Sequence, residues 1–197
     1  MAQKPEAAIH KGNELYKQKS YEASLQEYGK ALVTDPKNAT ANYNSGNAQF
    51  KANKPEDAVK AYDNTIENSK EQPLREKAFY NKGVALSKQQ KLQESIDAWK
   101  ESLKLDANDN DARENLQKAL MELKKQQQQK QNEDKDKKDK KQQDQKQKDE
   151  PKPQQQQSKL NKQQVEQLLK ALEQKEKEIQ QKMQKGNPQP NKPEKDW

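Results

Sequence analysis

The fold is decided by residues 46–65, GNAQFKANKPEDAVKAYDNT. A glycine opens this stretch, and a small, an aromatic and another small residue follow it twelve, sixteen and nineteen positions later. The same order returns after Gly12 and after Gly83. The three sets of small, aromatic and small residues are Ser24, Tyr28 and Ala31, then Ala58, Tyr62 and Thr65, then Ser95, Trp99 and Ser102. A pattern that recurs in register three times indicates an internal repeat.

The repeat length predicts pairs of helices. Gly12 and Gly46 are 34 residues apart, and Gly46 and Gly83 are 37 apart. Asp35-Pro36 ends one helix, and Pro55 suits the first turn of another. We expect first helices near 5–18, 39–52 and 74–89, and second helices near 21–34, 55–68 and 92–105.

The repeated glycine needs a compensating contact, because glycine within a helix costs up to ~1 kcal/mol relative to alanine. We expect it to let the second helix lie close to the first, with the small residue of the second helix against the glycine. The aromatic residue would fill the space between adjacent pairs. One pair cannot bury this surface alone, so the pairs should stack.

A seventh helix should cap the stack at about residues 109–123. It begins after Asp106-Ala107-Asn108-Asp109, and its other face is polar. Its apolar stripe consists of Ala112, Leu116, Ala119, Leu120 and Leu123.

The rest of the chain is low in apolar residues. Residues 124–159 hold no aliphatic or aromatic side chain, which predicts a disordered linker rich in Lys and Gln. Extension of the capping helix through its first part, up to about Gln131, stays open. An amphipathic helix is expected at 160–185, followed by a disordered tail at 186–197. That helix either docks on the solenoid or stays nascent, or else it binds a partner or self-associates. A membrane-surface role is least favoured.

Composition argues against several functions. The net charge of +7 lies wholly in residues 124–197, because residues 1–123 carry 19 basic and 19 acidic side chains. This distribution does not indicate a nucleic-acid-binding face. There are no cysteines, His10 is the only histidine, and no apolar run is long enough to span a bilayer. We therefore predict no enzyme activity, no metal and no cofactor.

Residues 5–123 resemble the tetratricopeptide repeat (TPR) family. The repeats would be 5–38, 39–72 and 76–109; the family's first-helix Trp position holds Ala8, Asn42 and Phe79 here. The resemblance implies an all-α, right-handed solenoid of three helix pairs plus the capping helix. It also implies a concave face that binds a protein or peptide.

The predicted groove residues lie around the glycines of the first helices. Amide side chains both donate and accept hydrogen bonds, and aromatic rings supply contact area. The set is Asn13, Tyr16, Tyr43, Asn44, Asn47, Phe50, Lys77, Tyr80 and Asn81. The family's carboxylate clamp is matched by Asn13, Asn44 and Lys77, whereas Ile9 and Asn81 replace a Lys and an Arg. Capture of a terminal carboxylate and an ordinary polar groove both stay open.

A narrower resemblance rests on the combination of repeats, Lys/Gln spacer, LLKALEQKEKEIQQKMQKG at 168–186 and a terminal KDW. This combination resembles the BatC-type proteins of Bacteroides aerotolerance (Bat) operons. The resemblance implies an adaptor in a cell-envelope complex linked to oxygen and oxidative-stress tolerance. Its partners would be von Willebrand A-domain membrane proteins. The family usually carries a signal peptide, so we expect a periplasmic or membrane-associated location after its removal; a cytoplasmic location is the alternative.

A different class of function stays open. The chain could be a self-contained structural or chaperone-like module whose own tail, ending at Trp197, occupies the groove.

Overall fold

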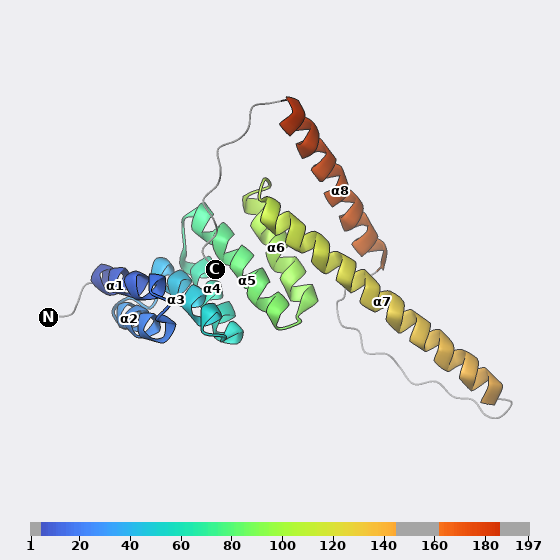
Figure 1. Ribbon diagram of the computed structural model, residues 1–197, viewed down its shortest axis with the longest axis horizontal. Helices are drawn as coiled ribbons and strands as arrows, with labels where there is room; N and C mark the ends of the chain where they lie inside the picture. Colours follow the sequence, from blue (N-terminus) through green and yellow to red (C-terminus); the bar gives the residue numbers. More distant parts are fainter. Residues whose placement is uncertain (1–4, 145–161, 186–197) are drawn as a thin grey trace. The chain divides into compact units, whose positions relative to one another are not determined.

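The computed structural model describes residues 5–144 and 162–185, which form α-helices and no strand. Figure 1 shows them in chain order. The chain divides into two compact units, the first reaching Leu116 and the second beginning at Gln117. The helices are α1 (Pro5–Lys17), α2 (Tyr21–Thr34), α3 (Ala39–Lys51), α4 (Pro55–Asn68), α5 (Gln72–Lys88), α6 (Leu92–Leu105), α7 (Asn110–Asp144) and α8 (Lys162–Lys185).

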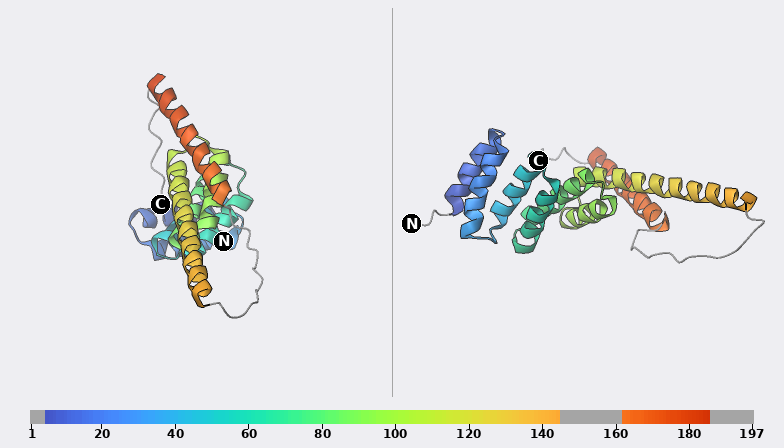
Figure 2. Two further views of the ribbon diagram at one scale, coloured as in Figure 1. Left: turned by 90° about the vertical axis from the view of Figure 1, so that its right-hand side faces the viewer. Right: turned by 90° about the horizontal axis from the view of Figure 1, so that it is seen from below.

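The first unit is a stack of three helix pairs. α1 packs on α2, α3 on α4 and α5 on α6, while α2 contacts α3 and α4 contacts α5 (Figure 2). The first helices of successive pairs also touch, α1 with α3 and α3 with α5. The predicted solenoid of three pairs is therefore confirmed, with helix ends within about two residues of the expected ones.

Each repeated glycine makes room for an aromatic ring. A Cβ atom at Gly46 would lie 2.6 Å from Cε1 of Tyr62, and one at Gly83 would lie 2.5 Å from Nε1 of Trp99. Gly12 stands in the same way against Tyr28. The atoms nearest to a Cβ at each glycine thus belong to the ring, whereas the sequence predicted the small residue of the second helix at this place. The ring lies between the two helices of its own pair, because only a residue without a Cβ leaves space for it.

Three left-handed residues end the first helices. Lys19, Asn53 and Gln90 have φ of 60°, 61° and 61°. The amide after each one bonds back to the last turn of the preceding helix; Lys54 N, for example, donates to Gln49 O at 2.8 Å. This is the Schellman arrangement, which glycine usually provides. Here it holds the last turn of α1, α3 and α5 in the same orientation in every repeat.

The core of the first unit is built from small residues and a few rings. Ala31, Ala41, Ala48, Ala78 and Ala85 are fully buried. Alanine lets helix backbones approach closely, so the rings supply most of the buried area. The two helices of the third pair are also joined by a buried bond, in which Ser102 Oγ of α6 donates to Glu76 Oε1 of α5 at 2.8 Å.

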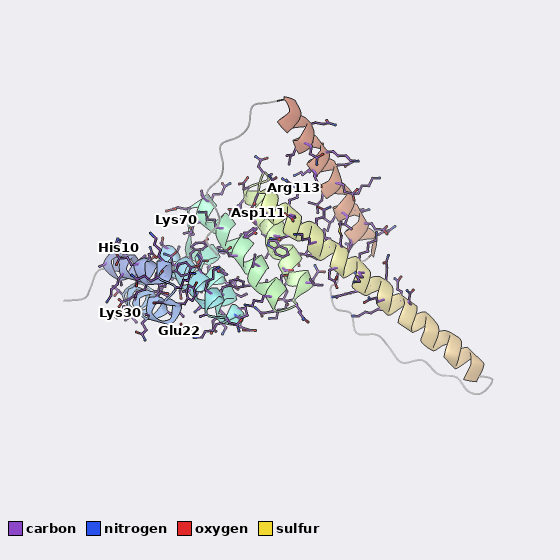
Figure 3. The ribbon with its side chains drawn as sticks, in the orientation of Figure 1. His10, Glu22, Lys30, Lys70, Asp111 and Arg113 are labelled. Carbon is purple, nitrogen blue, oxygen red and sulfur yellow. The ribbon has the colours of Figure 1, made fainter. Side chains whose placement is uncertain are left out.

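The start of α7 belongs to the first unit. Asp109 caps it, accepting from the amides of Asp111 and Ala112 at 3.0 and 3.2 Å. Arg113 donates to Asn110 Oδ1 at 2.7 Å and to Ala107 O at 2.6 Å. Figure 3 labels Asp111 and Arg113 in this first turn. Ala112 and Leu116 are buried, as the predicted stripe requires.

α7 is longer than expected. It continues through residues 124–144, where the sequence predicted a disordered linker. Gln, Lys and Glu are good helix formers, and no Gly or Pro occurs between Leu123 and Pro151. Polarity alone therefore did not end the helix. Residues 145–161, the rest of that linker, and the predicted tail at 186–197 lie outside the described residues.

The second unit contains the remainder of α7 together with α8. Lys124 Nζ on α7 lies 3.5 Å from Glu166 Oε1 on α8. Val165, Leu169 and Leu172 of the predicted amphipathic stripe are buried. This part of the stripe is thus already covered within the chain. None of the described helices has an apolar stretch that could cross a membrane.

Candidate functional site

Polar side chains bridge the first and second repeats. Asn13 directly follows Gly12 on α1, and its Oδ1 accepts from Tyr28 Oη at 2.8 Å. The same oxygen accepts from Asn44 Nδ2 on α3, also at 2.8 Å. One amide oxygen therefore joins both helices of the first pair to the first helix of the next.

The second and third repeats are bridged in the same way. Asn47 follows Gly46, and its Oδ1 accepts from Tyr62 Oη at 2.9 Å and from Asn81 Nδ2 at 3.0 Å. Asn81 Nδ2 also donates to Tyr43 Oη at 3.1 Å. Asn47 and Asn81 are buried. We call these contacts between amides and phenols the Asn–Tyr network.

The third repeat breaks the network. The residue after Gly83 is Val84, which has no side-chain amide. Trp99 takes the place of the tyrosine found in the other two repeats. Trp99 Nε1 is buried and has no hydrogen-bond partner among the described residues. One bond between an amide and a phenol is still present in this repeat: Asn115 Nδ2 of α7 donates to Tyr80 Oη at 2.9 Å.

The phenols of the network are protonated at neutral pH. Burial raises the pKa of Tyr28, Tyr62 and Tyr80 above the ordinary value of 10.0. Tyr28 and Tyr62 can therefore act as donors to the asparagines. The Asn–Tyr network is a permanent link between repeats over the physiological range.

A basic pocket lies where α1, α2 and α3 meet. Its volume is about 380 Å³. It is lined by Asn13, Tyr16, Lys17, Lys19, Tyr21, Tyr28, Asn44, Asn47 and Lys51. The lining includes three lysines and no carboxylate.

The lysines of the basic pocket have no acidic partner within residues 5–144 and 162–185. Lys11 and Lys30 pair with Glu27 at 2.9 Å, and Lys82 pairs with Asp63 at 2.6 Å. Lys17, Lys19 and Lys51, in contrast, form no ion pair with any described residue. Unopposed ammonium groups around a hollow create a positive potential that favours an anion.

An apolar pocket lies beside the third repeat, with a volume of about 290 Å³. It is lined by Phe50, Tyr80, Val84, Ser87, Trp99 and Asn115. Lys88 Nζ stands 5.1 Å above the centre of the Phe50 ring, a cation–π contact. Phe50, which lines the apolar pocket, and Lys51, which lines the basic pocket, are consecutive residues at the end of α3.

The predicted groove residues divide into three groups. Asn13, Tyr16, Asn44 and Asn47 line the basic pocket, and Phe50 and Tyr80 line the apolar one. Tyr43 and Asn81 are buried in the Asn–Tyr network. Lys77 is exposed and lines neither pocket. Of the clamp set, the structure brings Asn13 and Asn44 together, while Lys77 is not part of either pocket.

Sequence reasoning missed the lysines, although the sequence contained a signal. Lys17, Lys51 and Lys88 each stand five residues after a repeated glycine. They are the last residues of α1, α3 and α5, where a cation also complements the helix dipole. That ordinary structural role made them easy to overlook. The residues of the apolar pocket that were missed are Val84, Ser87, Trp99 and Asn115.

Metal chemistry finds no support in the described ranges 5–144 and 162–185, which hold no group of His, Cys, Asp or Glu suited to a metal ion.

Comparison with protein families agrees with the stacked helix pairs. A family model described as TPR repeat matches residues 12–53, and one described as tetratricopeptide repeat matches residues 43–112. The first unit is thus an α-solenoid of helix–turn–helix repeats. Residues 12–112 of the chain match tetratricopeptide repeats.

Solved structures with this fold include peptide complexes. The first TPR domain of Spaghetti (RPAP3), bound to the HSP90 peptide SRMEEVD, is 27% identical with a TM-score of 0.58, covering 62% of this chain and 95% of that one. The second TPR domain of human RPAP3, in complex with the HSP70 peptide SGPTIEEVD, is 26% identical with a TM-score of 0.53, covering 58% and 97%. YrrB, described as a TPR protein with an unusual peptide-binding site, is 26% identical with a TM-score of 0.52, covering 57% of each chain.

One curated relative matches part of the chain. The DnaJ homolog subfamily C member 7 homolog of Schizosaccharomyces pombe is 28% identical over 135 residues. The match covers 63% of this chain but only 26% of that protein. The chain therefore spans about a quarter of the length of this relative.

Proposed function

We propose that this protein is a non-enzymatic interaction scaffold that binds an acidic, extended segment of a partner protein at the basic pocket. The observation that carries the proposal is the set of three lysines, Lys17, Lys19 and Lys51, which line one hollow without any carboxylate. Peptides ending in EEVD, bound by similar TPR domains, have the matching charge.

The geometry indicates how such a segment would bind. Carboxylates would form charge-assisted hydrogen bonds with the lysine ammonium groups. Tyr16 and Tyr21 pack edge to face at 5.4 Å between ring centres and offer a rigid apolar wall. The asparagines of the Asn–Tyr network would hold the wall in place. Asn13 Oδ1 already accepts from Asn44 Nδ2, so in this proposal the two amides position the lysines and rings.

Fluorescence anisotropy with labelled SRMEEVD tests the proposal. A double variant, Lys17→Gln with Lys51→Gln, should bind at least about tenfold more weakly than the wild type, because each charge-assisted bond contributes ~1.5–3 kcal/mol. The matched control is Lys60→Gln with Lys104→Gln. These lysines are exposed and paired with Asp57 and Glu101 away from the pocket, so affinity should change less than about twofold.

Two further comparisons sharpen the result. The affinity should fall as salt rises, since the pocket is open to solvent. A neutral analogue, with Gln and Asn replacing the acids and an amidated end, should bind much more weakly. Equal binding of the acidic and neutral peptides, or equal losses in the two double variants, would contradict the proposal.

We also propose the narrower role of adaptor in a Bat-type cell-envelope complex, in the periplasm or at the membrane, with von Willebrand A-domain membrane proteins as partners. Its support is the sequence resemblance of the spacer and residues 168–197. A direct test is cross-linking of the tagged full-length protein in intact cells. Recovery of cross-links only to cytoplasmic proteins would contradict this placement.

A further inference from the structure

The residues that the sequence suggested for capture of a terminal carboxylate do not meet in the structure. Asn13 and Asn44 line the basic pocket, but Asn44 Nδ2 already donates to Asn13 Oδ1 at 2.8 Å. Asn81 is buried in the Asn–Tyr network, and Lys77 is exposed and lines neither pocket. The only cation of this set is thus absent from the pocket that holds the two amides.

The cations that do line the basic pocket stand at three separate places of the backbone. Lys17 is the last residue of α1, Lys51 is the last residue of α3, and Lys19 lies in the turn between α1 and α2. Lys17 and Lys51 hold the same position in first helices that touch, and packed helices have axes ~8–10 Å apart. All three side chains are exposed, and like charges repel. Such an arrangement suits several carboxylates along a segment better than the single carboxylate of a chain end.

Lys19 is held in a backbone conformation that residues with a Cβ disfavour. Its φ is 60°, in the left-handed region that glycine usually occupies at the end of a helix. Two hydrogen bonds fix this turn, from Lys19 N to Tyr16 O at 2.8 Å and from Ser20 N to Leu15 O at 2.9 Å. Backbone strain of this kind is often kept at ligand sites. The turn therefore fixes the point at which the Lys19 side chain leaves the backbone.

The other two repeats provide an internal comparison for Lys19. Asn53 and Gln90 occupy the same place in their turns, each with φ of 61°. Both are exposed, and neither lines the basic or the apolar pocket. Of these three left-handed residues, only Lys19 carries a charge and only Lys19 lines a pocket. The strained position and the pocket thus coincide in the first repeat alone.

From these observations we infer that the basic pocket takes an internal acidic segment of its partner, with two or more side-chain carboxylates, and does not need a free chain end. Lys19 determines this specificity most directly, because the backbone of the turn fixes the point from which its charge is presented. The inference rests on the proposed function and names the ligand class of the same pocket.

A set of labelled peptides separates side-chain carboxylates from a terminal one. SRMEEVD with a free end is compared with the amidated peptide and with SRMEEVD followed by GSGS and an amide. The fourth probe, SRMQQVN with a free end, keeps only the terminal carboxylate. With the full-length protein, the amidated and extended peptides should bind within about threefold of SRMEEVD, because they lose only the long-range attraction of one charge. SRMQQVN should bind at least about tenfold more weakly.

The variant Lys19→Gly tests the residue itself. Glycine relieves the left-handed strain, so the melting temperature should rise, while affinity for the extended peptide should fall at least about fivefold. The matched control is Gln90→Gly, at the same backbone position, which should also raise the melting temperature but leave affinity within about twofold. A purely structural role for Lys19 would make the two variants alike in both measurements.

A second control addresses the residues that the sequence suggested. Lys77→Gln should leave the affinity for SRMEEVD within about twofold, since Lys77 lines neither pocket. A loss of tenfold or more in this variant would mean that the terminal carboxylate is captured there, and would overturn the internal mode.

The outcomes separate this inference from the proposed function. If SRMEEVD binds and the extended peptide does not, or if SRMQQVN binds as well as SRMEEVD, the internal mode is overturned; the basic pocket still stands where Lys17→Gln with Lys51→Gln weakens SRMEEVD. If the extended peptide binds and Lys19→Gly does not weaken it, the internal mode is supported and the role of Lys19 is overturned. If no peptide binds, both proposals are overturned.

Discussion

The second and third repeats have the same pair of helices and differ in the contacts made by the residue after the repeated glycine. In both, a glycine receives the aromatic ring sixteen residues later. In the second repeat that ring is Tyr62, and Asn47 ties it to Asn81 of the next repeat. In the third, the ring is Trp99, and it lines a pocket together with Val84. The glycine and the ring thus pack the two helices of a pair together. The residue after the glycine determines whether the region beside the ring is closed by hydrogen bonds or contains a pocket.

This contrast changes the role that we assign to the asparagines of the first helices. The sequence predicted that these amides line the peptide-binding groove. In the structure Asn47 and Asn81 are buried and bonded to each other, and Asn13 and Asn44 are bonded as well. Their first role is therefore to join repeats. The surfaces left for a ligand are lysines and rings.

Substitution of the glycines that both repeats share should lower the free energy of unfolding the most. Gly46→Ala and Gly83→Ala should each lower the free energy of unfolding by ~1–3 kcal/mol or more, because the added methyl overlaps Tyr62 or Trp99. Gly29→Ala is the control, since a Cβ there has no atom within 4 Å, and it should be neutral or stabilising. Urea denaturation of the three variants checks this. Similar losses in all three would refute the packing role of the glycines.

The residue after the glycine should contribute more to the free energy of unfolding in the second repeat than in the third. Asn47→Ala leaves Tyr62 Oη and Asn81 Nδ2 without their common acceptor, so it should cost ~2–3 kcal/mol. Val84→Ala removes two methyl groups from a half-buried site and should cost about 1 kcal/mol. Chemical denaturation measures both. An Asn47 effect no larger than that of Val84 would mean that the network contributes little.

Much of the fold followed from the sequence, and less of the site. Gly12, Gly46 and Gly83 set the register of all six helices, because spacing along the chain determines packing within a pair. The bond from Asn44 to Asn13 joins residues 31 positions apart and depends on how repeats superimpose. Spacing does not fix that superposition. The end of α7 was missed for another reason: a polar segment without Gly or Pro has nothing to stop its helix.

Alkaline pH should act on the ring that packs on the glycine in the second repeat, Tyr62, and not on its counterpart in the third, Trp99, which does not ionise. The pKa of Tyr62 is raised by burial above 10.0, so above pH 10 the unfolded state loses this proton before the folded state does. The unfolded state then binds fewer protons, and the free energy of unfolding falls as pH rises. Below pH 10 this contribution is fully present. Tyr62→Phe should make the loss between pH 9 and 11 shallower, whereas Trp99→Phe should leave its slope unchanged. Denaturant melts at stepped pH values test this, and identical slopes for wild type and Tyr62→Phe would contradict it.

The smallest expected change in the free energy of unfolding comes from the turns between the two helices of a pair. Asn53 suits its left-handed conformation, but Gln90, with φ of 61°, does not. Gln90→Asn should raise the free energy of unfolding by a few tenths of a kcal/mol, up to about 1 kcal/mol. Its mirror, Asn53→Gln, should lower it by a similar amount. Thermal melts of the pair give the comparison, and shifts of the same sign would rule out backbone strain as the cause.

The most direct measurement of the account is NMR shift mapping of the ¹⁵N-labelled full-length protein with SRMEEVD. Amides that respond should lie around the basic pocket, in residues 13–21 and 44–51. The outer residues near Val33, which is 85% exposed, and the α8 helix should not respond. Shifts concentrated on those outer residues or on α8, with residues 13–21 and 44–51 unchanged, would contradict the claim that the inner face binds an acidic segment.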